Sequence, residues 1–264
     1  VYQGTAFRGG PSPVFHLKTP AQLVGAARSN QLALMDRLNR AHAAAHPDDT
    51  ELAARISNFE TAARMQATVP EVLDLSGESE ATRRMYGLDN PVTAEYGRRC
   101  LLARRMVERG VRFVQLFLNG QPWDTHDKNA ERLKGLCAAS DQPSAALVRD
   151  LKSRGLLDST VVLWTGEFGR LPISQGTDGR DHNRHAFSLW VAGGGFRAGH
   201  VHGATDDFGY RSVQDVVSVH DFHATLLHAL GIDHRLLHHP HEGREASLTD
   251  AEVTGARVVP ALLG

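Results

Sequence analysis

One run of eight residues, 111–118, constrains the fold of this chain more than any other feature. Its sequence, Val-Arg-Phe-Val-Gln-Leu-Phe-Leu, is mostly apolar and predicts a buried strand. A second run, 159–165, is rich in β-branched side chains, and a third, 186–192, precedes three consecutive glycines. Helical sequence separates the first two runs. Because strands that alternate with helices usually form a parallel sheet, we expect an α/β fold with a mostly parallel sheet and flanking helices.

The first 110 residues predict a layer of helices that belongs to the same domain. An extended entry, residues 1–20, contains several prolines and glycines. Apolar residues then recur near helical spacing in three segments, which are about 21–46, 50–67 and 91–109. Asp48 or Asp49 is placed to cap the second of these helices. We therefore divide the chain into a helical layer, 1–110, and an α/β portion, 111–264, that carries the chemistry.

The charge balance excludes some classes of partner. The chain has 29 Lys and Arg residues against 30 Asp and Glu residues, so it offers no electrostatic case for binding nucleic acid or an anionic membrane. No apolar run reaches the length of a membrane span, and no signal peptide is visible. Cys100 and Cys137 both lie in helical apolar patterns, where a buried free thiol is the default and a disulfide stays open.

Acidic and histidine side chains gather next to the predicted strands and at the start of the last predicted helix, about 221–230. In open α/β sheets, ligands bind outside the carboxyl ends of the strands. The residues that we select on this basis are Asp124, His126, Glu167, Arg170, Asp181, His182, Asn183, His220 and His223. Carboxylate and imidazole groups together suit Zn²⁺, Mn²⁺ or a similar cation, which would polarise an ester oxygen or generate a hydroxide at neutral pH.

Several of these positions also have an ordinary structural explanation. Asp124 is placed to cap the following helix, and Asp221 to cap the last one. Glu167 and Arg170 would form an exposed ion pair, and the Asp-His pair at 181–182 would form a plain turn. The histidines near the end of the chain are interpreted as solvated, and they are His234, His238, His239 and His241.

Several motifs in this order closely resemble a sulfatase-like bacterial family described as domain of unknown function 1501. The resembling segments are 1–5, 123–126, 162–172, 179–183, 192–195, 203–206 and 220–227. The resemblance covers nearly the whole chain. That family is similar to the alkaline phosphatase superfamily, which implies the α/β fold and a site for divalent metal: zinc, manganese, calcium or magnesium. Its members often carry a twin-arginine export signal, so the resemblance implies an exported protein, periplasmic or extracellular.

The resemblance also implies roles for individual residues. Asp124 and His126 match the first carboxylate and histidine pair of the superfamily, Glu167 its second acidic position, and His182 its late histidine. Phe168 departs from the pattern, because a histidine ligand is expected there. Either another residue substitutes, or one metal position is weakened or lost. The candidate substitutes are Asp181, His220 and His223. Arg170 would assist catalysis and Asn183 would contact the substrate.

The implied function is metal-dependent hydrolysis of sulfate or phosphate esters, on small molecules or polysaccharides. Family members have a further segment before the part seen here, and the superfamily places its nucleophile there. We therefore expect an incomplete domain that is inactive alone and that associates through an exposed sheet edge. Two alternatives stay open: a secreted, non-catalytic binding or structural module on the same fold, and a metal-dependent phosphomutase or transferase.

Overall fold

The structure, a computed structural model, describes residues 6, 7, 14, 17, 20, 23–118, 120–241 and 243–264, except for the side chains of residues 67, 68 and 244. The extended entry predicted for residues 1–20, with the resembling segment 1–5, falls largely outside these ranges. The chain divides into two compact units, Val1–Glu80 and Ala81–Gly264. No helix in the described ranges is long and apolar enough to cross a membrane.

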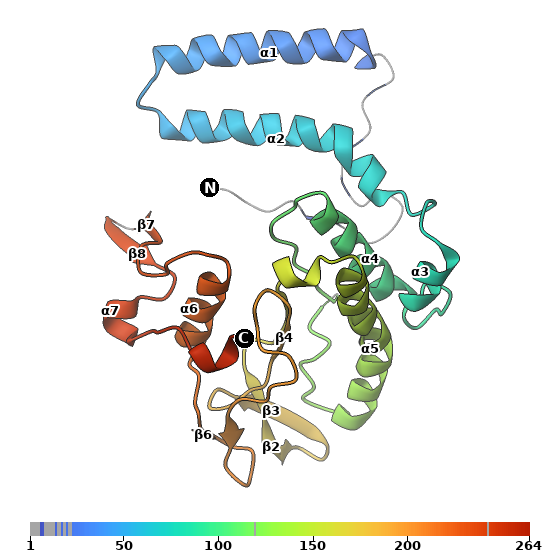
Figure 1. Ribbon diagram of the computed structural model, residues 1–264, viewed down its shortest axis with the longest axis vertical. Helices are drawn as coiled ribbons and strands as arrows, with labels where there is room; N and C mark the ends of the chain where they lie inside the picture. Colours follow the sequence, from blue (N-terminus) through green and yellow to red (C-terminus); the bar gives the residue numbers. More distant parts are fainter. Residues whose placement is uncertain are drawn as a thin grey trace. The chain divides into compact units, whose positions relative to one another are not determined.

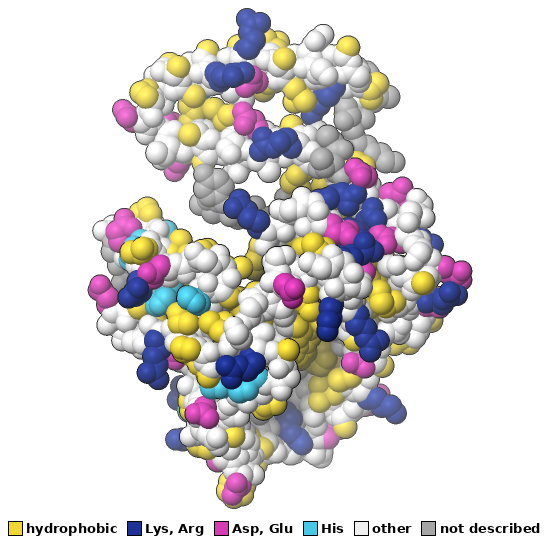
Figure 2. Space-filling model, in the orientation of Figure 1, with side chains coloured by type: hydrophobic (Ala, Val, Ile, Leu, Met, Phe, Trp, Pro, Cys, Tyr) yellow, Lys and Arg dark blue, Asp and Glu magenta, His cyan; other side chains and the backbone are white. Residues whose placement is uncertain are grey.

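The first unit is a helical hairpin of α1 (Ala26–Ala45) and α2 (Thr50–Leu73), which lie side by side (Figure 1). Asp49 caps α2 by accepting a 2.8 Å hydrogen bond from the Leu52 N–H, which confirms one of the two predicted caps. None of the described residues of α1 is buried. Leu38 is 57% exposed and Phe59 is 69% exposed, and apolar side chains show at the surface of both helices (Figure 2).

In the second unit, α4 (Ala94–Glu108) and α5 (Asn129–Ser153) pack against each other, and α3 (Glu80–Met85) precedes them. The apolar core here includes Tyr86, Cys100, Leu101 and Leu151. The predicted helices at 91–109 and before residue 154 are thus confirmed. Both cysteines are free. A buried thiol is correct for Cys100 but wrong for Cys137, which is exposed.

Within the described residues, the strands form four separate two-stranded antiparallel sheets. These are β1 (Val162–Trp164) with β4 (Trp190–Ala192), β2 (Gly169–Gln175) with β3 (Gly179–Asn183), β5 (Ala204–Thr205) with β6 (Ser212–Gln214), and β7 (His238–His241) with β8 (Arg244–Ser247). The prediction of a mostly parallel sheet is wrong for these strands. A parallel pair needs a crossover of a dozen or more residues, whereas only three residues join β2 to β3.

Residues 111–118 form no strand, although their sequence predicts one. Phe113 is 79% exposed and Phe117 is 65% exposed. Among the described residues, no backbone hydrogen bond joins 112–118 to a neighbouring segment. A strand exists only through the ladder that it shares with a partner, so this run forms no strand. The carbonyl of Phe117 accepts a hydrogen bond from the Arg99 side chain instead.

The described part of the second unit also contains two further α-helices and two short 3-10 helices. Helix α6 (Val219–Ala229) begins with a capping box, in which Ser218 is the N-cap and Asp221 bonds back to it. Asp221 is therefore the third residue of the helix rather than its cap. The other described elements of this unit are the 3-10 helices Leu157–Ser159 and Pro260–Leu262, and α7 (Ala251–Thr254).

Candidate metal centre

The loop before α5 holds Asp124 and His126 and is fastened to the β2–β3 hairpin. The Arg180 N–H donates to the carbonyl of Thr125 over 3.0 Å, and the Lys128 N–H donates to the Asp178 carboxylate over 3.0 Å. Thr125 is buried, and its hydroxyl hydrogen-bonds to Asn129 Oδ1. The two flanking side chains therefore project from a fixed stretch of backbone.

Gly179, the first residue of β3, permits this close contact between the loop and the hairpin. A Cβ atom at position 179 would lie 1.8 Å from the backbone oxygen of His126, which is far inside any real contact. Only glycine lets the two backbones approach so closely. The loop and the hairpin are thus fitted to each other at the residue next to the site.

The hairpin contributes His182 and Arg170. These two residues are directly opposite each other in the β2–β3 register, so their side chains lie on the same face. Because successive side chains of a strand alternate between faces, Asp181 and Asn183 are directed away from that face. The hairpin therefore presents one imidazole and one guanidinium towards the loop.

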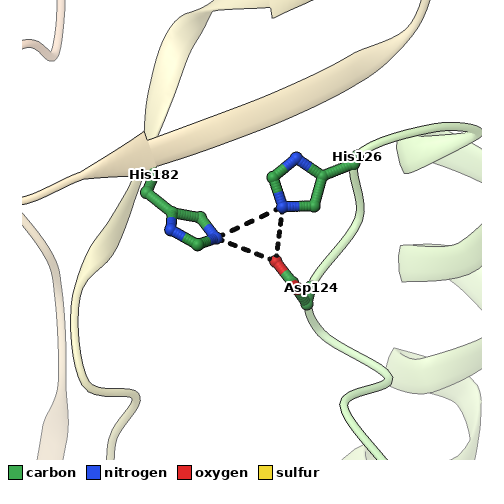
Figure 3. Close-up of side chains that lie close together, drawn as sticks. All are labelled: Asp124, His126 and His182. Carbon is green, nitrogen blue, oxygen red and sulfur yellow. Dashed lines mark hydrogen bonds and ion pairs between the residues drawn. The ribbon is translucent and has the colours of Figure 1, made fainter.

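Three ligand atoms meet between the loop and the hairpin (Figure 3). His126 Nε2 lies 2.9 Å from Asp124 Oδ1, and His182 Nε2 lies 3.1 Å from the same oxygen. The two imidazole Nε2 atoms are 3.2 Å apart. Asp124 is half-buried, whereas both histidines are exposed, so the cluster opens to solvent.

Asp124 is the electrostatic centre of the cluster. Its Oδ1 atom also accepts a 2.6 Å ion-pair contact from Arg170. The hydrogen bond from His182, and then the one from Arg170, lower the pKa of Asp124 to about 2. The carboxylate is therefore ionised throughout the physiological pH range and is ready to bind a cation.

Gln175, the last residue of β2, determines how His126 presents its ring. The Gln175 Oε1 atom lies 2.6 Å from His126 Nδ1. An amide oxygen only accepts hydrogen bonds, so Nδ1 carries a proton and the ring turns its Nε2 atom towards Asp124. A ligating histidine is normally oriented in this way by an acceptor on its other nitrogen.

Comparison with known proteins places the chain in one family. The family model described as "Protein of unknown function (DUF1501)" matches residues 1–263. The chain belongs to this family. Searches of curated proteins and of solved structures gave no significant match. The family description states no activity, so the function of this DUF1501 protein must be argued from its site.

Phe168 does not take the place of a ligand in this DUF1501 protein. Its ring packs against His182, with the ring centroids 4.3 Å apart, and the Arg170 Cζ atom lies 5.8 Å from the centroid of Phe168. The phenyl ring therefore forms an apolar wall beside both hairpin side chains. It fixes their directions and offers no ligand atom.

The remaining predicted residues lie outside the cluster of ligand atoms. Glu167 is exposed, and the Asp181 carboxylate accepts a hydrogen bond from the His182 backbone. Asn183 is buried, and its amide donates to the Tyr210 carbonyl, so it supports the backbone rather than facing a substrate. His220 and His223 are exposed on α6. The structure thus brings together Asp124, His126, His182 and Arg170 only.

Proposed function

We propose that this DUF1501 protein binds a divalent metal ion at Asp124, His126 and His182 and uses it to hydrolyse phosphate or sulfate esters. The convergence of three ligand atoms from two distant segments carries the proposal. Their separations are 2.9, 3.1 and 3.2 Å. Two ligands of a tetrahedral zinc ion, each about 2.0–2.1 Å from the metal, lie roughly 3.3 Å apart. A metal would therefore require only a slight expansion of the cluster.

The donor types favour zinc or a similar transition metal. Two imidazoles and one carboxylate are typical ligands of zinc, whereas calcium and magnesium prefer oxygen ligands alone. Three protein ligands leave one position open, as in catalytic rather than structural zinc sites. A cation bound there would polarise an ester oxygen and lower the pKa of water.

The protonation of the cluster also supports a cation. Because Gln175 accepts from Nδ1, the His126 ring turns its Nε2 atom towards the ionised oxygen of Asp124 at 2.9 Å. A proton between these two atoms accounts for their approach in the metal-free protein. A metal ion would take the place of that proton.

Water is the nucleophile that we propose for the reaction, so this proposal departs from the expectation, implied by the family resemblance, that the chain is inactive alone. Thr125 is the hydroxyl residue between the two loop ligands, but its side chain is buried and hydrogen-bonded to Asn129. His126 and His182 have side chains that are 40% and 46% exposed, so an ester can reach the cluster from solvent. Arg170 lies beside the cluster with the positive charge that an anionic ester needs.

Calorimetric titration with Zn²⁺ and Mn²⁺ tests the metal site. We expect binding by the wild-type chain, loss of binding in His182→Ala, and unchanged binding in His200→Ala, which removes an exposed histidine outside the cluster. A wild-type chain that binds neither ion would overturn the proposal, as would equal binding by His182→Ala.

Turnover of p-nitrophenyl phosphate and p-nitrophenyl sulfate tests the hydrolase. We expect release of nitrophenol by the zinc-loaded or manganese-loaded chain, and its abolition by a chelator and by His182→Ala. A metal-loaded chain that cleaves neither ester would refute hydrolysis. Metal binding without turnover would instead indicate a non-catalytic module.

A further inference from the structure

Arg170 occupies the carboxylate oxygen that a metal ion would need. Its Nη2 atom lies 2.6 Å from Asp124 Oδ1, the same oxygen that both histidines approach. A guanidinium and a divalent cation at one oxygen repel each other, since both are positive. Metal binding and the Arg170–Asp124 ion pair therefore compete.

The second nitrogen at the end of the guanidinium, Nη1, is not used by the ion pair with Asp124. Arg170 Nη1 is buried and has no hydrogen-bond partner among the described residues. A buried donor without a partner is costly, so its retention beside the cluster calls for a ligand. Release of Nη2 from Asp124 would leave two parallel donors, a fork that matches two oxygens of a phosphate or sulfate group.

Phe168 keeps this fork close to the cluster after its release. The Arg170 Cζ atom lies 5.8 Å from the centroid of the Phe168 ring, and the same ring packs against His182. Guanidinium groups are attracted to aromatic rings. The arginine would therefore stay beside the metal ligands when its ion pair with Asp124 breaks.

We propose that Arg170 is a latent oxyanion-binding residue, which Asp124 restrains until a divalent cation takes over the Asp124 carboxylate. Binding of the cation releases the guanidinium, which then holds the tetrahedral phosphate or sulfate group of the ester. The inference deepens the proposed function and rests on it for the identity of the cation. Because coupling between two sites is reciprocal, bound oxyanion also strengthens binding of the cation.

The substitution Asp124→Asn tests the restraint of Arg170 without any metal ion. The substitution removes the negative charge that holds Arg170 and keeps the shape of the side chain. We expect this variant, without any metal, to bind inorganic phosphate and sulfate at least about tenfold more tightly than the metal-free wild type, a ratio usual for coupled sites. The double variant Asp124→Asn with Arg170→Gln is expected to lose the gain.

Phosphate and sulfate are titrated calorimetrically into the chelator-treated proteins, and circular dichroism verifies that each variant is folded. The proposed restraint of Arg170 by Asp124 would be overturned if metal-free Asp124→Asn bound phosphate and sulfate no more tightly than wild type. A double variant that retained the gain in affinity would also overturn it. This arm contains no metal, so its outcome is independent of whether the hydrolase proposal succeeds.

Arg170→Gln gives a second measurement that does not depend on the Asp124 variants. If Arg170 competes with the metal, its removal strengthens Zn²⁺ binding in the absence of oxyanion. It also abolishes the improvement in Zn²⁺ affinity that sulfate produces in the wild type. Weaker Zn²⁺ binding by Arg170→Gln, or an undiminished effect of sulfate, would show that the arginine is not a competitor and would refute the proposal.

Discussion

Arg170 and His182 are directly opposite each other in the β2–β3 hairpin, and both side chains reach the same oxygen of Asp124. The hairpin register therefore places the guanidinium of Arg170 and the imidazole of His182 on one face. They lie 2.6 and 3.1 Å from the same Asp124 oxygen. This arrangement makes Asp124 the residue on which the charge balance of the site depends. The effect of Asp124 ionisation on stability can be measured in the metal-free protein.

The stability of the metal-free protein is expected to depend on Asp124 in acid. Hydrogen bonds from His182 and Arg170 lower the pKa of Asp124 from 3.8 to about 2. A carboxyl group whose pKa is depressed by folding stabilises the folded state above its unfolded pKa, and that contribution is lost as the pH falls towards the folded value. The advantage of wild type over Asp124→Asn in urea unfolding should therefore shrink between about pH 5 and pH 2. An advantage that is constant over this range would contradict the assignment.

Gly179→Ala is expected to separate the loop from the hairpin. The added Cβ atom would meet the backbone oxygen of His126 at 1.8 Å, so the backbone must move. We expect a loss of about 1–3 kcal/mol in the free energy of unfolding, together with weaker Zn²⁺ binding.

Gly135→Ala is the matched control for this substitution. Gly135 lies inside α5, and a Cβ atom there would meet nothing within 4 Å. Alanine is expected to stabilise the helix by about 0.5–1 kcal/mol and to leave Zn²⁺ binding unchanged. Urea unfolding and calorimetry distinguish the two variants. Equal stability and equal metal affinity in both would show that the close contact at Gly179 is unimportant.

Gln175 is expected to act as a positioning residue for His126. Its amide oxygen, 2.6 Å from Nδ1, holds the ring with Nε2 directed towards the cluster. Gln175→Ala should therefore weaken Zn²⁺ binding by about 10- to 100-fold, as is usual when the outer partner of a ligating histidine is removed.

Gln175→Glu retains an acceptor at the same place and should restore the affinity. NMR signals of the His126 ring nitrogens report the tautomer directly in each variant. Loss of affinity in both variants, with the tautomer unchanged, would indicate a structural role for Gln175 instead.

Local signals made the helices predictable. Asp49 before α2 and Gly110 after α4 mark helix ends through interactions within a few residues, so the sequence contains the information. The direction of strand pairing is not local in this sense. Residues 159–165 and 186–192 were correctly interpreted as containing strands, but their pairing is antiparallel. The loop chemistry between them did not reveal this.

The candidate site was predictable where ligand types occur in a short motif. Asp124, His126 and His182 were all found in this way. Asp181 was not separable from His182 by residue type, because only the two-residue alternation of β3 shows which one faces the loop. Gln175 was missed, since no motif distinguishes an amide that orients a histidine 49 positions away.

Residues 111–118 are expected to cause self-association. Phe113 and Phe117 are largely exposed, and residues 112–118 have no backbone partner among the described residues. A segment with exposed apolar side chains and no backbone ladder of its own is a template for pairing with another chain. In sedimentation velocity, the average mass of the wild-type chain should therefore rise with concentration.

A double substitution, Phe113→Lys with Phe117→Lys, should keep the chain monomeric over the same range, because charges on an open edge oppose pairing. The matched control is Phe208→Lys. Phe208 is 81% exposed but lies between β5 and β6, away from residues 111–118 in the sequence, and its substitution should leave association unchanged. A wild-type chain that remains monomeric at all concentrations would contradict the prediction. An equal effect of Phe208→Lys would show that association depends on exposed apolar side chains in general rather than on the open strand edge.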